Sequence, residues 1–169
     1  MTIDPALLRE AEALLRALRE RGLMLATAES CTGGLVAASL AGIAGASDVL
    51  ERGFVTYTNA AKHEMLGVPE AIFARYGAVS EECARAMAEG ALTRSRAQVT
   101  VAVTGIAGPG GGSAEKPVGL VHFAAARSGG PVLHRERRFA DVGRLEIQRL
   151  SVLEALELVA EAADVPATA

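Results

Sequence analysis

Three short apolar segments alternate with helical patterns along this chain, and each apolar segment ends at a polar or glycine-rich stretch. The segments are 23–28, 54–58 and 98–104. Strands that alternate with helices are typical of a three-layer α/β/α sandwich. Two further strands are predicted over 118–126 and 132–139, and the short glycine-containing turn between them indicates a hairpin. We therefore expect an α/β fold with a mixed, mostly parallel sheet.

The helical patterns have recognisable ends. Asp4 followed by Pro5 predicts the start of a first helix, and Asn59 is expected to cap a helix that carries Lys62 one turn inside. Further helices are predicted over 69–76, from Ser80 onward, and along a last segment marked by Val152, Leu156, Val159 and Ala163. No linker or repeat interrupts the pattern, so we expect one domain over 1–169 with a frayed tail over 164–169.

The composition excludes several classes of partner. Asp and Glu number 20 against 17 Lys and Arg, and aromatic residues make up 4% of the chain. Such a chain has no basic field for a polyanion and few rings on which bases could stack, so nucleic acid is not an expected partner. No apolar run approaches the roughly 18 residues of a membrane span, and the N-terminal segment does not resemble a signal peptide. We expect a cytoplasmic protein without a membrane partner.

The metal-binding residue types are few and scattered. The chain has Cys31 and Cys83 without a CxxC pair, and the histidines His63, His122 and His134 lie far apart in the sequence. This spacing matches neither a zinc site nor a disulfide framework. We expect no metal and no cofactor.

Three segments of interest follow predicted strands. They are Ser30 to Gly34, Tyr57 to Lys62, and Thr104 to Gly112. In open α/β sheets, ligands bind at the carboxyl ends of the strands. A site built from these three segments is therefore expected.

Ser30 is a candidate nucleophile. It lies between a predicted strand and a predicted helix, where backbone N–H groups and the helix dipole favour a developing oxyanion. The flanking residues Glu29 and Cys31 exclude a GxSxG elbow, and Gly33 excludes an SxxK motif. Two alternatives stay open: Ser30 or Thr32 is only a helix cap, or Cys31 is the nucleophile instead of a small buried thiol.

Lysine is rare in this chain. Of 17 basic residues only Lys62 and Lys116 are lysines, so the remaining 15 are arginines. A lysine, unlike an arginine, loses its proton readily when it is desolvated, and it can then act as a base toward a serine hydroxyl. Lys62 is therefore a candidate general base. The alternative is a solvent-facing residue on a short helix.

A glycine-rich loop follows the third strand. Its residues 105–113 could hold a phosphate with backbone N–H groups. No Gly-Lys-Ser/Thr sequence follows, so the loop is not a Walker A motif. The alternative is a flexible tip without a ligand.

Four sequence blocks resemble the CinA carboxy-terminal domain family. They are TAESCTGG at 27–34, FVTYTNAAKHEMLGV at 54–68, YGAVSEECARAMAEGA at 76–91 and VTGIAGPGGGSAEKPVGLVHFA at 103–124. The resemblance covers roughly 7–160. Standalone members of that family are nicotinamide mononucleotide amidohydrolases. The resemblance thus implies hydrolysis of the carboxamide of nicotinamide mononucleotide to nicotinic acid mononucleotide and ammonia.

The resemblance also implies roles for individual residues. Ser30 matches the family's nucleophile, Lys62 matches its base, and Tyr57 is carried over as a proton relay. The mechanism would be a serine acyl-enzyme with backbone N–H groups near 30–34 as the oxyanion hole. The expected substrate-binding residues are Thr32, Gly33, Gly34, Asn59, Thr104, Gly105, Gly108, Gly110 and Gly111.

One segment departs from the family pattern. The usual F-x-G-x-R before the last helix is one residue longer here, at 139–144, and Gln148 stands where a second arginine is common. Substrate contact by Arg144 is therefore left open. We expect a homo-oligomer that takes a small nucleotide substrate, and the alternative function is a noncatalytic nucleotide-binding or partner-regulatory module.

Overall fold

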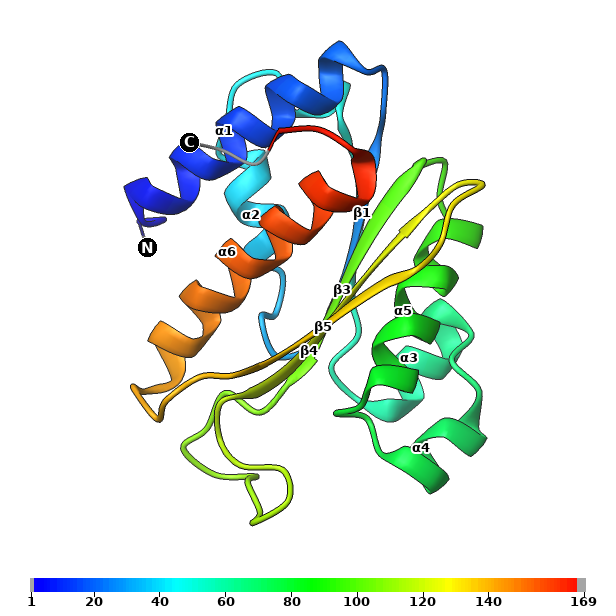
Figure 1. Ribbon diagram of the computed structural model, residues 1–169, viewed down its shortest axis with the longest axis vertical. Helices are drawn as coiled ribbons and strands as arrows, with labels where there is room; N and C mark the ends of the chain where they lie inside the picture. Colours follow the sequence, from blue (N-terminus) through cyan, green and yellow to red (C-terminus); the bar gives the residue numbers. More distant parts are fainter. Residues whose placement is uncertain (1, 167–169) are drawn as a thin grey trace.

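The computed structural model describes residues 2–166, which form one five-stranded sheet with helices on both faces (Figure 1). The elements in chain order are α1 (Pro5–Glu20), β1 (Leu25–Glu29), α2 (Leu35–Ala41), the 3₁₀ turn η1 (Ala46–Asp48), β2 (Leu50–Val55), α3 (Asn59–Leu66), α4 (Glu70–Tyr76), α5 (Glu81–Thr93), β3 (Val99–Gly105), β4 (Leu120–Arg127), β5 (Leu133–Arg138) and α6 (Arg144–Ala163). Among the described residues, no helix is both long and apolar enough to cross a membrane.

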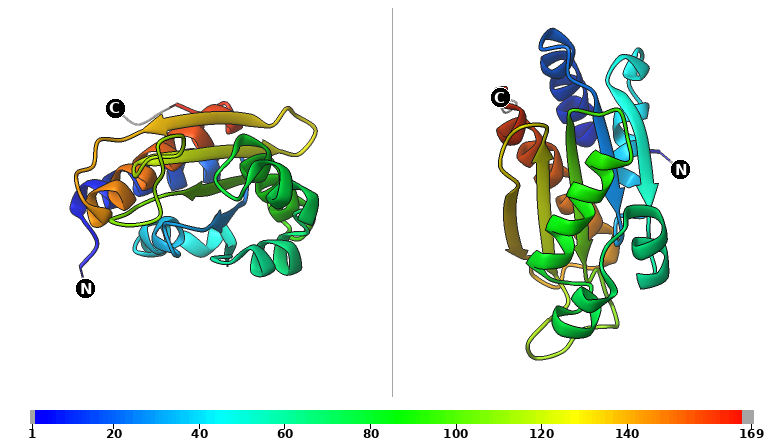
Figure 2. Two further views of the ribbon diagram at one scale, coloured as in Figure 1. Left: turned by 90° about the horizontal axis from the view of Figure 1, so that it is seen from below. Right: turned by 90° about the vertical axis from the view of Figure 1, so that its right-hand side faces the viewer.

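The sheet has the strand order β2-β1-β3-β4-β5. β1 pairs in parallel with β2 and β3, whereas β4 pairs antiparallel with both β3 and β5. Only β4 therefore runs against the other strands. Helices α1, α2 and α6 cover one face and α3, α4 and α5 cover the other (Figures 1 and 2). The predicted α/β/α sandwich with a mixed, mostly parallel sheet is confirmed.

The two faces of the sheet carry side chains of different size. On β3, Val99, Val101 and Val103 join the core beneath α1, α2 and α6, whereas Ala102 faces α5. Small residues let α5 lie close to the sheet and to α3: a Cβ added at Gly90 would meet the Leu66 carbonyl oxygen at 2.0 Å. This close packing fixes α3, the helix that carries Lys62.

The second strand differs from its prediction. Residues 54–58 were expected to form it, but β2 begins at Leu50, pairs with β1 and ends at Val55. The chain leaves the sheet there because the carbonyl oxygens of Thr56 and Tyr57 accept hydrogen bonds from a lysine side chain. The expected cap of α3 is also wrong by one residue, since Thr58, in an extended conformation, accepts the bond from the Ala61 N–H.

Asp164 and Val165, which were expected to belong to a frayed tail, are held at the end of α6. Asp164 ends α6 in the left-handed conformation, and the Val165 N–H donates to the Ala160 carbonyl at 3.0 Å. The Val165 side chain is 9% exposed and packs in the core beneath α1 and α6. Residues 167–169 of that tail lie outside the described residues.

Candidate active site

The carboxyl ends of the three parallel strands β1, β2 and β3 surround one cavity of about 280 Å³. The segments after these strands each contribute to its lining, and the first residue of α6 completes it. The lining residues are Ser30, Cys31, Tyr57, Asn59, Lys62, Ala78, Val79, Thr104, Gly105, Ile106, Ala107, Gly108, Gly110, Gly111 and Arg144. The three segments that the sequence marked therefore meet at one edge of the sheet.

Ser30 is the first residue after β1. Its N–H donates to the Val103 carbonyl at 2.9 Å, which extends the β1–β3 pairing to the serine itself. Its own carbonyl accepts from the Gly33 N–H at 3.0 Å, and this bond closes the tight turn that leads into α2. The hydroxyl is thus held at the cavity by backbone contacts on both sides, with 8% of the residue exposed.

Lys62 reaches Ser30 from α3. Its Nζ lies 2.9 Å from Ser30 Oγ, 3.0 Å from the Thr56 carbonyl oxygen and 3.1 Å from the Tyr57 carbonyl oxygen. All three partners are neutral, and the residue is 1% exposed. Burial lowers the pKa of Lys62 below its ordinary value because the charged form loses its hydration.

The contacts of Nζ also define where its lone pair lies in the neutral amine. A neutral amine has two N–H bonds and one lone pair, and carbonyl oxygens can only accept. The two carbonyls therefore take both N–H groups, and the lone pair faces Ser30 Oγ. This arrangement can remove a proton from the serine hydroxyl.

Glu29, which the sequence analysis did not single out, occupies the N-terminus of α2. Its carboxylate is fully buried and accepts from the backbone N–H groups of Val36 at 2.8 Å and Ala37 at 3.0 Å. These N–H groups are therefore closed to a ligand. A sequence signal did exist, because a carboxylate that ends an otherwise apolar strand needs buried donors.

Three expected binding residues lie outside the cavity lining. Thr32 is buried, and its hydroxyl donates to the Glu29 carboxylate at 2.7 Å. Gly33 and Gly34 have positive φ values of 57° and 100° and form the turn into α2. All three shape the Ser30 turn from outside the cavity.

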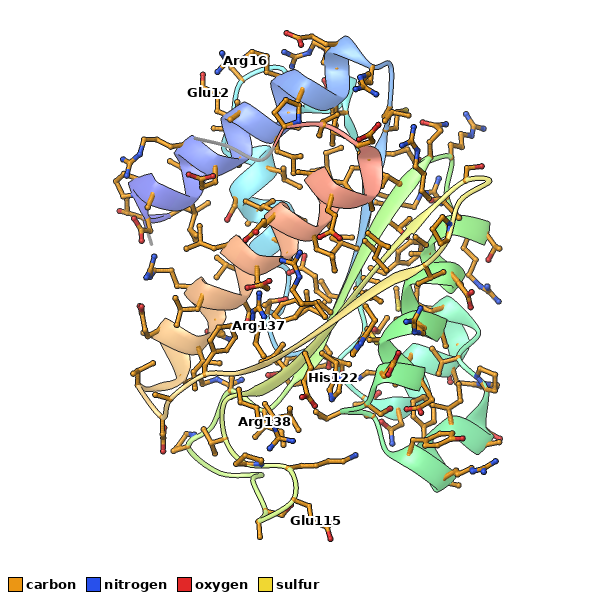
Figure 3. The ribbon with its side chains drawn as sticks, in the orientation of Figure 1. Glu12, Arg16, Glu115, His122, Arg137 and Arg138 are labelled. Atoms are coloured by element: carbon orange, nitrogen blue, oxygen red, sulfur yellow. The ribbon has the colours of Figure 1, made fainter. Side chains whose placement is uncertain are left out.

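The glycine-rich loop forms a second part of the cavity wall. Gly105, Gly108, Gly110 and Gly111 all line the cavity, and a Cβ added at Gly110 would meet nothing within 4 Å. The hydroxyl of Thr104 donates to the Ala78 carbonyl at 2.8 Å and so fixes the segment before α5. The outer end of the loop, at Glu115, points away from the sheet (Figure 3).

Lys116, the second lysine, has a different position from Lys62. Its Nζ donates to the Tyr76 carbonyl at the end of α4, at 2.6 Å. This contact fastens the outer part of the glycine-rich loop to α4. Lys116 does not line the cavity.

Arg144 spans the mouth of the cavity. From the N-terminus of α6, its guanidinium donates to Tyr57 Oη at 2.5 Å and to the Gly108 carbonyl at 2.8 Å. One turn further along α6, Gln148 donates to the Cys31 carbonyl at 2.9 Å. The sequence left substrate contact by Arg144 open because the segment before it is one residue longer than the family pattern. It named Gln148 only as a departure from that pattern and indicated no contact for it, because Cys31 is distant in the chain.

Cys31 is buried against the cavity. Burial raises the pKa of the Cys31 thiol to about 12, so the reactive thiolate is scarce at neutral pH. Burial therefore disfavours Cys31 as the alternative nucleophile.

Two of the histidines meet away from the cavity. His122 Nδ1 and His134 Nε2 are 2.9 Å apart across β4 and β5. Residues 2–166 contain no group of three or more metal-ligating side chains.

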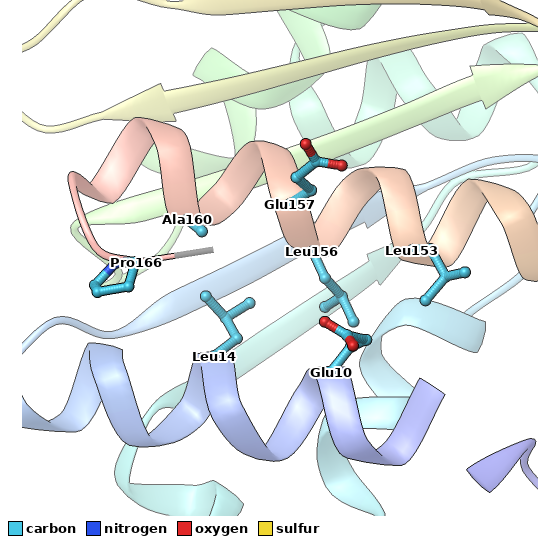
Figure 4. A pocket seen from close by; sticks show the side chains of 7 residues that line it. All are labelled: Glu10, Leu14, Leu153, Leu156, Glu157, Ala160 and Pro166. Atoms are coloured by element: carbon cyan, nitrogen blue, oxygen red, sulfur yellow. The ribbon is translucent and has the colours of Figure 1, made fainter. Parts of the chain in front are cut away.

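A larger cavity of about 400 Å³ lies between α1 and α6 (Figure 4). Leu14, Leu153 and Leu156 line it, and its charged groups are the carboxylates of Glu10 and Glu157. No nucleophile faces a base there. Of these two cavities, the one at the carboxyl ends of the strands is where a serine hydroxyl contacts a lysine amine.

Comparison with known families gives one match over most of the chain. Residues 8–163 match the family described as the CinA C-terminal domain. The chain is 53% identical to the competence/damage inducible protein CihA from Agrobacterium tumefaciens, whose crystal structure superposes with a TM-score of 0.94. That similarity covers 96% of this chain and 99% of the other.

Curated relatives fall into two length classes. A nicotinamide-nucleotide amidohydrolase PncC from Enterobacter agglomerans is 54% identical over 73% of this chain and 76% of its own length. The protein of that name from Escherichia coli is 50% identical over 81% of this chain and 83% of its own length. By contrast, the chain spans 27% of a CinA-like protein from Akkermansia muciniphila, at 62% identity, and 29% of a relative from Symbiobacterium thermophilum.

The burial of Lys62 predicts a pH-dependent stability. Because its pKa in the folded chain lies below the ordinary 10.5, the unfolded chain binds more protons between the two pKa values, and the free energy of unfolding rises with pH over that interval. We expect the stability of the wild type relative to Lys62→Met to rise as pH approaches 10.5 from below and to level off above it. Thermal unfolding of both proteins over a pH series measures this difference. If the difference in stability does not change with pH, the pKa of Lys62 is not lowered in the folded chain.

Proposed function

Because the chain belongs to the CinA C-terminal domain family, we propose that it is an amidohydrolase that converts nicotinamide mononucleotide and water to nicotinic acid mononucleotide and ammonia. The observation that carries the proposal is the 2.9 Å contact between Ser30 Oγ and Lys62 Nζ at the cavity. Two relatives that are named nicotinamide-nucleotide amidohydrolase, and of which the chain covers 76% and 83%, supply the substrate class.

The proposed reaction begins with proton transfer from Ser30 to Lys62. Neutral Lys62 takes the hydroxyl proton while Oγ attacks the carboxamide carbon, which forms a tetrahedral intermediate. The C–N bond then breaks, and the proton held by Lys62 goes to the departing nitrogen, so ammonia leaves. Water, activated by the same amine, hydrolyses the ester on Ser30 and regenerates the hydroxyl. The reaction needs no redox partner or cofactor.

The oxyanion requires donors that the protein has not already used. The N–H groups of Ser30 and Gly33 bond to protein carbonyls, and those of Val36 and Ala37 bond to Glu29. We assign the oxyanion to the Cys31 N–H, which follows the nucleophile on the cavity lining. This narrows the sequence-based expectation that the whole 30–34 turn forms the hole.

We place the phosphate of the substrate at the part of the cavity lined by Arg144 and the glycine-rich loop. The guanidinium of Arg144 lies there beside Gly108, and the open face of Gly110 allows a close approach to the backbone. A guanidinium and backbone N–H groups are typical phosphate donors. Tyr57 is a proton relay in this proposal, and its hydroxyl at the mouth accepts from Arg144. Asn59, exposed at the start of α3, is proposed to contact the ribose.

Product formation distinguishes the proposed amidohydrolase from the alternative, a noncatalytic nucleotide-binding or partner-regulatory module. Incubation of the chain with nicotinamide mononucleotide and measurement of ammonia is the direct experiment, because binding alone releases none. The expected cytoplasmic location and homo-oligomeric state stay predictions.

Ser30→Ala is expected to abolish ammonia release. The substitution removes only the attacking oxygen, and an alanine near a helix start costs about 1 kcal/mol of stability. Turnover of the variant and its thermal unfolding are measured together. Near wild-type turnover by a folded Ser30→Ala protein would eliminate Ser30 as the nucleophile.

Lys62→Arg is expected to be as inactive as Lys62→Ala. Arginine keeps the positive charge but does not give up a proton near neutral pH, so it cannot serve as the base. The ratio of kcat values for the two variants tests this. If arginine preserves most of the activity, Lys62 acts through its charge and the base lies elsewhere.

Nicotinamide riboside is expected to be a poor substrate. Charge-assisted hydrogen bonds contribute about 1.5 to 3 kcal/mol each, so loss of two lowers kcat/KM on the order of a hundredfold or more. Part of the loss should appear in kcat, because the phosphate helps to orient the carboxamide.

The matched variants are Gly110→Ala at the cavity and Gly130→Ala in the β4–β5 turn, where an added Cβ makes only ordinary contacts. Gly110→Ala should reduce the discrimination between the two substrates, whereas Gly130→Ala should leave it unchanged. Equal kcat/KM values for both substrates in the wild type would contradict the phosphate site.

A further inference from the structure

The carboxylate of Glu29 has an unusually complete set of donors. Its Oε1 accepts from Thr32 Oγ1 at 2.7 Å and from the Val36 N–H at 2.8 Å. Its Oε2 accepts from Thr27 Oγ1 at 3.2 Å and from the Ala37 N–H at 3.0 Å. Four donors use the full accepting capacity of an ionised carboxylate, and they replace the water lost on complete burial.

These donors lie on both sides of the nucleophile. Thr27 belongs to β1, before Ser30, whereas Thr32 and Val36 follow it in the turn and in α2. The carboxylate therefore ties the end of the strand to the start of the helix across the Ser30 turn. A change in the position of this anchor would move the turn as a unit.

The main chain of Glu29 extends the same anchor toward the base. Its carbonyl accepts from the Thr56 N–H at 2.9 Å, and the Thr56 carbonyl accepts from Lys62 Nζ at 3.0 Å. Glu29 is thus one peptide bond from Ser30 and two hydrogen bonds from Lys62.

We infer that Glu29 is a positioning residue, whose carboxylate holds the Ser30 turn so that Oγ stays opposite Lys62 Nζ. The inference rests on the proposed amidohydrolase function. Its physical basis is the short range of proton transfer and attack, since a displacement of about 1 Å in the reacting groups can cost on the order of a hundredfold in rate. The alternative is a carboxylate that only stabilises α2.

The test compares Glu29→Gln with Ser39→Ala. Glutamine keeps the shape of the side chain, but its NH₂ group faces an N–H or hydroxyl donor instead of accepting from it. Ser39 is also buried on α2, where its hydroxyl donates to the Leu35 carbonyl at 2.8 Å, away from the cavity. Both variants change a buried polar side chain that contacts α2, but only the first disturbs the Ser30 anchor.

The readouts are kcat and KM for nicotinamide mononucleotide, and the thermal midpoint of each protein. For Glu29→Gln we expect kcat to fall by about tenfold to a hundredfold with KM within about threefold of the wild type. Ser39→Ala should leave kcat unchanged, whatever its effect on the midpoint, because the Ser39 hydroxyl bonds within α2. If Glu29→Gln lowers only the midpoint, the carboxylate is a structural cap and the inference is overturned.

A second variant covers the case in which Glu29→Gln does not fold. Thr32→Val removes one of the four donors and leaves the carboxylate in place, so it should fold and lower kcat by a smaller factor at unchanged KM. Unchanged kcat in Thr32→Val would then count against the inference.

Different outcomes overturn the inference about Glu29 and the proposed amidohydrolase function. A wild-type chain that releases ammonia, together with Glu29 and Thr32 variants of unchanged kcat, overturns the inference and leaves the proposed function intact. A wild-type chain that releases no ammonia, and whose Ser30 does not react with an aryl sulfonyl fluoride, overturns the proposed function and the inference with it.

Discussion

A buried lysine amine that meets only neutral partners organises this structure. Lys62 Nζ contacts one hydroxyl and two carbonyl oxygens, and 1% of the residue is exposed. Without a carboxylate to stabilise the ammonium form, burial favours the neutral amine. The same contacts account for the local fold, because the carbonyls that hold the amine are those of Thr56 and Tyr57, where β2 has ended. A lysine that lost this setting would be an ordinary surface cation, and the proposed reaction would lack its base.

The start of α2 illustrates how a generally favourable anion site can already be filled. Helix N-termini attract anions through their free N–H groups. Here Glu29 supplies that anion from within the chain and bonds the Val36 and Ala37 N–H groups. An incoming negative charge must therefore be met elsewhere. In the proposed reaction, the Cys31 N–H and the wall that contains Gly110 and Arg144 meet it, so the proposal divides the cavity into a reaction side and a binding side.

The two faces of the sheet carry side chains of different size, and this difference positions Lys62 and Arg144 at the cavity. Alanine and glycine on the α5 side bring α3 close to α5, so that Lys62 enters the cavity from a rigid support. On the other face, larger side chains separate α6 from the sheet, and its first residue, Arg144, reaches over the cavity mouth to Tyr57. Relatives of similar length carry the amidohydrolase name. The chain spans 27% of one longer relative, so a similar sequence also occurs as part of a longer chain.

The sequence by itself determined the three-layer class, the hairpin and the meeting of three segments, 30–34, 57–62 and 104–112, at one sheet edge. These follow from local patterns, because parallel strands end at a common edge and the polar residues after them must meet there. The sequence did not determine where β2 ends, that Glu29 closes the α2 N-terminus, or that Arg144 contacts Tyr57 from 87 positions away. Each of these depends on hydrogen bonds between segments that are distant in the chain or on the filling of a buried donor set. Only the packed tertiary structure decides which partner each buried polar group receives, since every such group must be paired once water is excluded.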